Sequence, residues 1–178
     1  MHRRRALQTS AVMLVAAAPL AACTGELQTF TSWKAGQQAV LELLFREKLV
    51  HDNPWNLSQV LQHLAQSVEF SMQGFPVLKG AWFRSSVGAA AFAVFNARGA
   101  MSHTLDEPIP GAPALDAGQT LKTSVQRLLD AMDAFAASTS PLRPHFAYGE
   151  LSKPQYERAH LMHLANHWQH FVSKTAIA

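Results

Sequence analysis

The sequence predicts an all-α fold: a four-helix bundle with an extra shorter helix and long connections. Four long stretches carry apolar residues at spacings of three and four, the period of a helix with one buried face. No stretch longer than a few residues alternates as a half-buried strand would. With 178 residues, 48% of them hydrophobic, the chain can form one domain with a single core.

The first two helices lie on either side of a predicted turn at residues 51–54. The first is expected over residues 31–46, where Thr31-Ser32 can cap it, although Gly36 weakens its first turns. The second begins at Asn56 or Ser58 and ends near Gly74. Its apolar positions are Leu57, Val60, Leu61, Leu64, Val68 and Met72.

The second half of the chain continues the helical pattern. A shorter, alanine-rich helix is expected over residues 81–98, with Gly99 as its C-cap. Residues 100–118 contain three prolines and read as a long loop. The next helix has the apolar pattern Leu121, Val125, Leu128, Leu129, Met132 and Phe135. Ser152 then caps the last helix, with Pro154 in its first turn.

Residues 1–23 read as an export signal. A basic Arg3-Arg4-Arg5 segment, similar to a twin-arginine signal, precedes an apolar stretch at residues 11–20 that is too short to span a bilayer. Leu20-Ala21-Ala22-Cys23 matches a lipobox, which predicts lipidation at Cys23, the only cysteine of the chain. The alternatives are a soluble protein cut after Ala16-Ala17-Ala18 and a short uncleaved anchor.

The leader sets the expected location and charge of the mature protein. We expect a periplasmic lipoprotein held to the membrane through Cys23, in the outer membrane rather than the inner, because Thr24 and Gly25 follow the cysteine. A tether over residues 24–30 would precede a helical domain over residues 31–178. Without the three leader arginines, 12 basic residues balance 12 acidic ones. A near-neutral domain lacks the positive surface that a nucleic-acid partner requires.

Four of the nine histidines lie close together near the C-terminus. On a helix they span about 80° of one side: His160, His163, His167 and His170. His163 and His167 form an i, i+4 pair, which can offer two imidazoles to one metal ion. Spacing alone leaves open whether the stripe is a metal site or a polar face.

A third imidazole for such a site is His63, in the second helix. Three neutral imidazoles suit zinc, nickel, iron or manganese and leave a coordination position open, as in catalytic sites. His63 lies about 130° from the centre of its helix's apolar stripe, which argues against an inward position. The residues alone therefore favour a polar, partly exposed His63.

The motifs around these histidines resemble the DinB/YfiT-like four-helix bundles, closest to a domain-of-unknown-function branch. The resemblance lies in the turn and last helix, Pro144-His145-Phe146-Ala147-Tyr148-Gly149-Glu150-Leu151-Ser152 with Tyr156, His160, His163, His167 and Phe171. It also lies in Leu57-Ser58-Gln59-Val60-Leu61-Gln62-His63-Leu64-Ala65-Gln66-Ser67, in Gly74-Phe75-Pro76 and in Ile109-Pro110-Gly111-Ala112-Pro113. Two features depart from the branch: Asn166 replaces a frequent histidine, and the usual His-Pro order is Pro144-His145.

The resemblance implies a divalent metal held by His63, His163 and His167, with His160, His170 and His145 as groups that orient a ligand or lie at the rim. It also implies a metal-dependent hydrolase or S-transferase acting on a small molecule. The alternatives are a metal- or ligand-binding lipoprotein without turnover and an inert bundle. Glu150 and Glu157 are the nearest carboxylates in sequence, but helical geometry turns Glu157 away from His163. A homodimer is compatible with the sequence.

Overall fold

The structure is a computed structural model that describes residues 25–46, 49–51 and 54–173. The predicted export signal and Cys23 lie outside these residues. The elements, in chain order, are α1 (Trp33–Glu42) with a 3₁₀ turn (Leu43–Phe45), β1 (Leu49–His51), α2 (Leu57–Gln73), α3 (Ala81–Phe83), a π-helical segment (Arg84–Gly88), α4 (Ala89–Arg98), α5 (Leu121–Ala137), α6 (Lys153–Trp168) and β2 (Phe171–Ser173).

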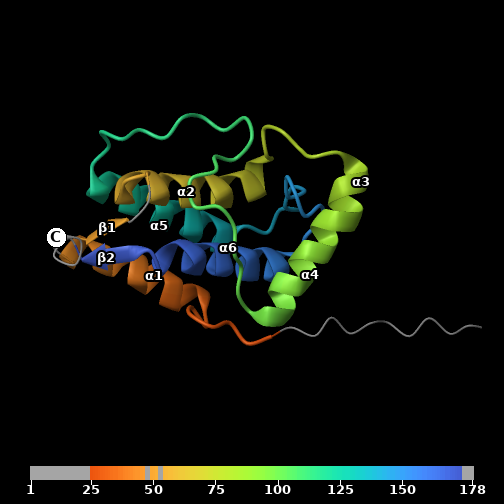
Figure 1. Cartoon of the computed structure of the whole chain (residues 1–178), viewed down its shortest axis with the longest axis horizontal. Coiled ribbons are helices and arrows are strands. Elements are labelled where there is room, and N and C mark those ends of the chain that lie inside the picture. The colour runs from red at the N-terminus through yellow and green to blue at the C-terminus, as the bar shows by residue number, and fades with distance from the viewer. Residues whose placement is uncertain (1–24, 47–48, 52–53, 174–178) are drawn as a thin grey trace, which may run out of the picture.

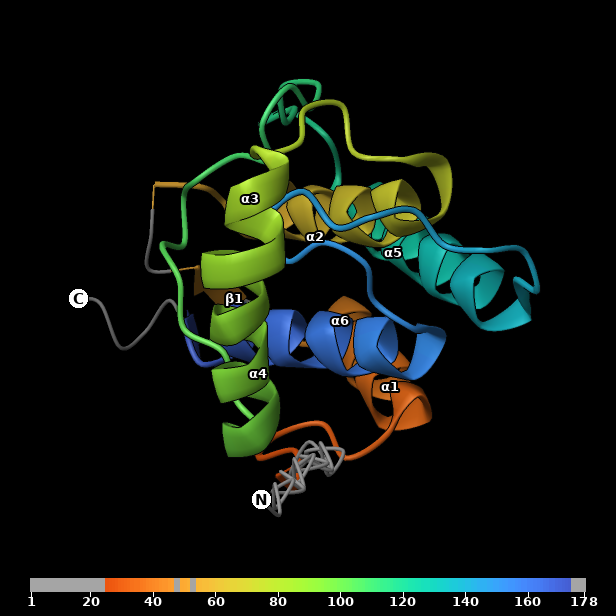
Figure 2. The same ribbon diagram turned by 90° about the vertical axis from the view of Figure 1, so that its right-hand side faces the viewer.

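The predicted all-α class is confirmed. Helices α1, α2, α5 and α6 form the bundle, and α2 packs against both α5 and α6. Helix α3, the π-helical segment and α4 form one continuous shorter helix that crosses one end of the bundle (Figures 1 and 2). A two-stranded antiparallel pair, β1 with β2, was not predicted, because three residues per strand are too few to show an alternating pattern.

Helix α1 is shorter than predicted but begins where expected. The Ser32 hydroxyl accepts a hydrogen bond from the Ala35 amide, and the α-helix ends at Glu42. Gly36, which weakens the helix intrinsically, lies where α1 approaches α6 closely. A Cβ added at Gly36 would stand 2.9 Å from Leu161 Cδ2. Gly36 therefore lowers the intrinsic stability of the helix but allows α1 to pack closely against α6.

Helix α2 begins with a capping box in which the side chains of Asn56 and Gln59 each bond the other's backbone amide. The prediction that His63 is partly exposed was wrong: its exposed fraction is 4%. Twelve of the 17 residues of α2 are buried, because the loop after α4 covers the face that α5 and α6 leave open. Gln62 and Gln66 bind the backbone of this loop, at Asp116 and Pro113 respectively.

The helix over residues 81–98 forms as predicted, and Gly99 ends it in the left-handed conformation. Gly88 faces the turn before α6, and a Cβ there would collide with the carbonyl oxygen of Ala147. Only glycine allows this approach of helix to turn. The turn itself closes through paired backbone hydrogen bonds between His145 and Gly149.

Helix α6 begins at the predicted cap, since Ser152 and Gln155 form a second capping box. Its fully buried Tyr156 donates a hydrogen bond to the carbonyl of Arg143. The helix ends at Trp168, so His170 lies in the turn that follows it. Within the described residues, no helix combines the length and apolar character needed to cross a membrane.

Candidate metal centre

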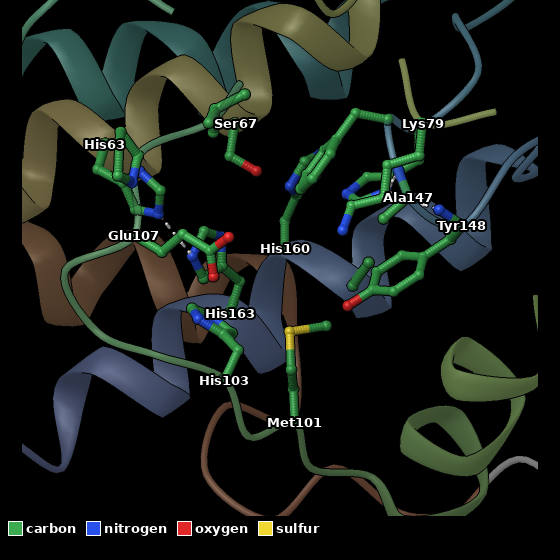
Figure 3. A pocket seen from close by; sticks show the side chains of 15 residues that line it. His63, Ser67, Lys79, Met101, His103, Glu107, Ala147, Tyr148, His160 and His163 are labelled. Atoms are coloured by element: carbon green, nitrogen blue, oxygen red, sulfur yellow. Dashed lines mark hydrogen bonds between the residues drawn. The ribbon is translucent and has the colours of Figure 1, made fainter. Parts of the chain in front are cut away.

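Helices α2 and α6 bring His63, His163 and His167 together inside the bundle. Figure 3 shows His63 and His163 facing each other. One ring nitrogen from each lies within 4.8 Å of the other two. The closest pair, His63 Nε2 and His163 Nε2, are 3.1 Å apart. Two nitrogens bound tetrahedrally to one zinc ion would be about 3.3 Å apart. The three imidazoles therefore have a spacing that one divalent ion could bridge.

Two of the three histidines, His63 and His163, lie in an environment that keeps their imidazoles neutral. His167 is fully buried, and His63 is nearly so. Burial, with a smaller contribution from nearby His103, lowers the pKa of His63 to about 3. Burial and the neighbouring histidines hold the pKa of His163 well below 6.5. Neutral rings keep the lone pairs that a metal requires.

His63 also shows that the protein alone does not satisfy this cluster. Its Nδ1 is buried and has no hydrogen-bond partner within the described residues. Its Nε2 faces the Nε2 of His163, and at least one of two neutral nitrogens in such a pair is an acceptor. A cation placed among the rings would bind the lone pairs of both Nε2 atoms in place of this hydrogen bond. The donor set fits a divalent metal.

A fourth histidine, His103, lies beside the three. Its ring centroid is 4.8 Å from that of His163 and 5.4 Å from that of His167. Its Nδ1 donates a hydrogen bond to the Thr104 carbonyl at 2.7 Å, which leaves a lone pair on Nε2. Burial lowers the pKa of His103. Sequence reasoning missed His103, because it lies in a loop where no periodic spacing relates it to α2 or α6.

The loop that carries His103 is tied to α6 by Asn166, the residue that replaces a histidine of the resembling branch. Asn166 is buried, and its Nδ2 donates to the carbonyl of His103 at 3.5 Å. Asn166 therefore helps to hold the His103 loop beside the histidine cluster.

The three histidines expected around the site fall in different places. His160 is buried in α6, where its ring stacks on Tyr156 and meets the edge of Phe135. His145 lies in the turn before α6, and its Nδ1 accepts hydrogen bonds from the amides of Ala147 and Tyr148. Both line the cavity beside the cluster, whereas His170 does not.

A cavity of about 170 Å³ opens beside His63 and His163. It is lined by His63, Ser67, Lys79, Met101, His103, Glu107, Pro108, Ile109, His145, Phe146, Ala147, Tyr148, Ala159, His160 and His163. Glu107 is its carboxylate, and it lies close enough to His103 to raise the pKa of that imidazole, against the larger effect of burial. Neither Glu150 nor Glu157 lines the cavity.

The chain matches one family model, described as "Protein of unknown function (DUF1569)", over residues 26–174. The match covers both helices of the histidine cluster, the loop of His103 and the turn of His145. This chain belongs to the DUF1569 family. No curated protein and no solved structure matches the DUF1569 protein.

The family match agrees with one part of the resemblance seen in the sequence, the domain-of-unknown-function part. All three clustered histidines of the DUF1569 protein lie inside the matched residues, as do His103 and Glu107.

Proposed function

We propose that the DUF1569 protein binds one divalent metal ion through His63, His163 and His167 and is a metal-dependent enzyme acting on a small molecule. The observation that carries this proposal is the meeting of three imidazoles from two helices, α2 and α6, with His63 and His163 at the wall of a cavity. Zinc, nickel, iron and manganese all suit such ligands. The same bundle and histidine set support membership of the DinB-like superfamily.

The residues around the cluster favour hydrolysis. A divalent ion held there would supply a Lewis acid for activating water or a thiol. Glu107 lines the same cavity and can accept the proton that a water nucleophile gives up. A thiol transferase would instead need a thiol from a cosubstrate, because the only cysteine of the chain is Cys23 in the leader. Glu107 therefore makes hydrolase the first choice and S-transferase the second.

We further propose that the protein acts outside the cytoplasm as a lipoprotein anchored at Cys23. The lipobox and the basic, apolar leader support this location. An exported position also argues for hydrolysis, since intracellular thiol cosubstrates would be scarce there. Labelled palmitate should enter the wild-type protein and not Cys23→Ala; an unlabelled wild type would exclude lipidation.

Metal analysis by mass spectrometry tests the metal site directly. Protein purified without affinity histidines should contain about one divalent metal per chain. His163→Ala combined with His167→Ala should remove it, because only one ligand of the proposed set, His63, remains. His170→Ala, a histidine next to the same helix but outside the cavity, should retain it. A metal-free wild type, or full occupancy in the double variant, would overturn the proposal.

A second candidate function is a metal carrier or sensor without turnover, and His103 is the observation that favours it. Structural zinc sites have four protein ligands, whereas catalytic sites have three and an open position. The Nδ1–H of His103 bonds a backbone carbonyl, as the far nitrogen of a metal-binding histidine commonly does. If the Nε2 of His103 completed the shell, no position would remain for a substrate.

A further inference from the structure

The cavity has a second polar cluster, at the end away from the histidine triad (Figure 3). It consists of Lys79, His145, Tyr148 and His160. We infer that this cluster binds the carboxylate of a small organic substrate whose other end reaches the metal site. The second half of this statement depends on the proposed function, whereas the carboxylate site itself does not.

Two of the four side chains are hydrogen-bond donors by geometry. Because His145 Nδ1 accepts two backbone N–H bonds, at 3.1 Å each, the ring proton of neutral His145 is on Nε2. The Tyr148 ring stacks on the His145 ring at 4.2 Å. Burial raises the pKa of Tyr148 to about 12, so its hydroxyl keeps its proton at neutral pH. Both donors come from one turn.

The unpartnered ring nitrogen of His160 points most directly to a ligand. Its Nε2 is buried and has no hydrogen-bond partner within the described residues, although the ring lines the cavity. Burial lowers the pKa of His160 to about 3, so the ring is neutral and has one N–H to donate. A buried polar atom without a partner is rare in folded proteins. Because that nitrogen has almost no accessible surface, a ligand oxygen in the cavity would supply the partner once the His160 ring turns toward it.

Lys79 gives the cluster its positive charge. Among the described residues that line the cavity, it is the single lysine or arginine. Its backbone amide donates to the Phe146 carbonyl at 2.9 Å, which fixes it to the turn of His145 and Tyr148. Its ammonium lies 4.9 Å from the centre of the Phe83 ring. From that exposed position the flexible side chain can swing to an anion in the cavity.

The helix backbone beside this cluster packs closely against the turn that carries His145 and Tyr148. The π-helical segment Arg84–Gly88 faces the turn, and Gly88 is needed for their contact. Single π-helical turns inside α-helices occur frequently at functional sites. The segment therefore packs against the turn whose residues His145 and Tyr148 line this end of the cavity.

The charges in the cavity decide which end an anion takes. In the metal-free protein, Glu107 lies with His103 and the triad, so a carboxylate is repelled from that end and attracted to Lys79. One cation and three neutral donors balance the single charge of a carboxylate, whereas half of the charge of a phosphate dianion would stay uncompensated.

The shape of the cavity limits the rest of the ligand. His160 and His163 are three residues apart on α6, so the two clusters are about 5 Å apart along the helix. Met101, Ile109 and Ala159 give the cavity an apolar wall. Its volume of about 170 Å³ is close to that of a cavity that holds benzene. The expected substrate is a small acid whose reacting group lies a few bonds from the carboxylate.

Two hydroxamates test the proposed carboxylate site in the metal-loaded protein. Both succinate monohydroxamate and butyrohydroxamate can bind the metal, but only the first carries a carboxylate at the other end. By calorimetry, the first should bind at least about tenfold more tightly, the effect of one charge-assisted hydrogen bond. Lys79→Gln and Tyr148→Phe should each remove most of that advantage and leave butyrohydroxamate affinity unchanged. Lys122→Gln, an exposed lysine outside the cavity, should retain it.

Butyrate binding to the metal-free protein tests the carboxylate site separately from the proposed metal-dependent function. Butyrate should shift the imidazole nitrogen resonances of His145 and His160. The butyrate affinity measured from these shifts should fall at least about fivefold in Lys79→Gln. Butyramide, neutral and of the same shape, should bind more weakly. If the protein takes up no metal, the butyrate measurement alone decides whether the carboxylate site exists. Equal affinity for both hydroxamates in metal-loaded protein, or butyrate that leaves both histidines unperturbed, would overturn the carboxylate site.

Discussion

His103 is the residue on which the coordination of the proposed metal depends. Its ring contacts those of His163 and His167, yet the ring nitrogens that lie within 4.8 Å of one another come from the triad. An enzyme with an open position needs three ligands, whereas a carrier would use four. The position of His103 thus separates two functions that share the same three histidines.

We expect His103→Ala to lower zinc affinity by no more than about a hundredfold, the upper end for loss of a group next to the ligands, whereas His63→Ala should lower it far more. The reason is that His63 Nε2 lies 3.1 Å from His163 Nε2, within the proposed ligand set. Competition titration with a zinc chelator measures both affinities. Equal, large losses in the two variants would support the carrier instead.

The individual site residues differ in how far sequence could identify them. His163 and His167 follow from helical spacing, because an i, i+4 pair on one helix is a local property. His63 rests on the family resemblance, since its own helix pattern suggested exposure. His103 and Glu107 carry no local signal at all: their position depends on how the loop after α4 folds over α2.

At the scale of elements, the contact of the π-helical segment with the turn before α6 supports one end of the cavity. Gly88→Ala should lower the free energy of unfolding by about 1–3 kcal/mol, the usual cost of overpacking. The added Cβ would meet the Ala147 carbonyl, a backbone atom that cannot rotate away. The gain in helix propensity, up to about 1 kcal/mol, is smaller.

Urea unfolding of Gly88→Ala measures this effect, and Gly80→Ala is its matched control. A Cβ at Gly80 has no atom within 4 Å, so that variant should stay within about 1 kcal/mol of wild type. Equal stability of the two variants would show that the turn yields to the added methyl group.

For the whole molecule, the amphipathic pattern was enough to predict the class, the long helices and the extra helix. It could not predict the burial of His63, because the pattern assumes that one face of a helix meets solvent. In α2 that face is covered by a loop whose backbone is bonded to Gln62 and Gln66. Polar residues that bind a covering loop look, in sequence, like residues that face water.

The buried histidines together make the stability of the metal-free fold depend on pH. Burial lowers the pKa values of His63, His145 and His160 to about 3, against 6.5 in the unfolded chain. Between these values the unfolded state binds protons that the folded state does not. Stability is therefore complete above about pH 7 and falls as the pH drops through 6.5 toward 3.

Each of these histidines should cost on the order of 2 kcal/mol between pH 7 and pH 5. Chemical denaturation of the metal-free protein at several pH values measures the slope. His160→Gln should reduce the slope by the uptake of about one proton, because it removes one titrating ring, whatever its effect on stability at pH 7. A stability that stays flat from pH 7 to pH 5, or an unchanged slope in His160→Gln, would contradict neutral burial of these imidazoles.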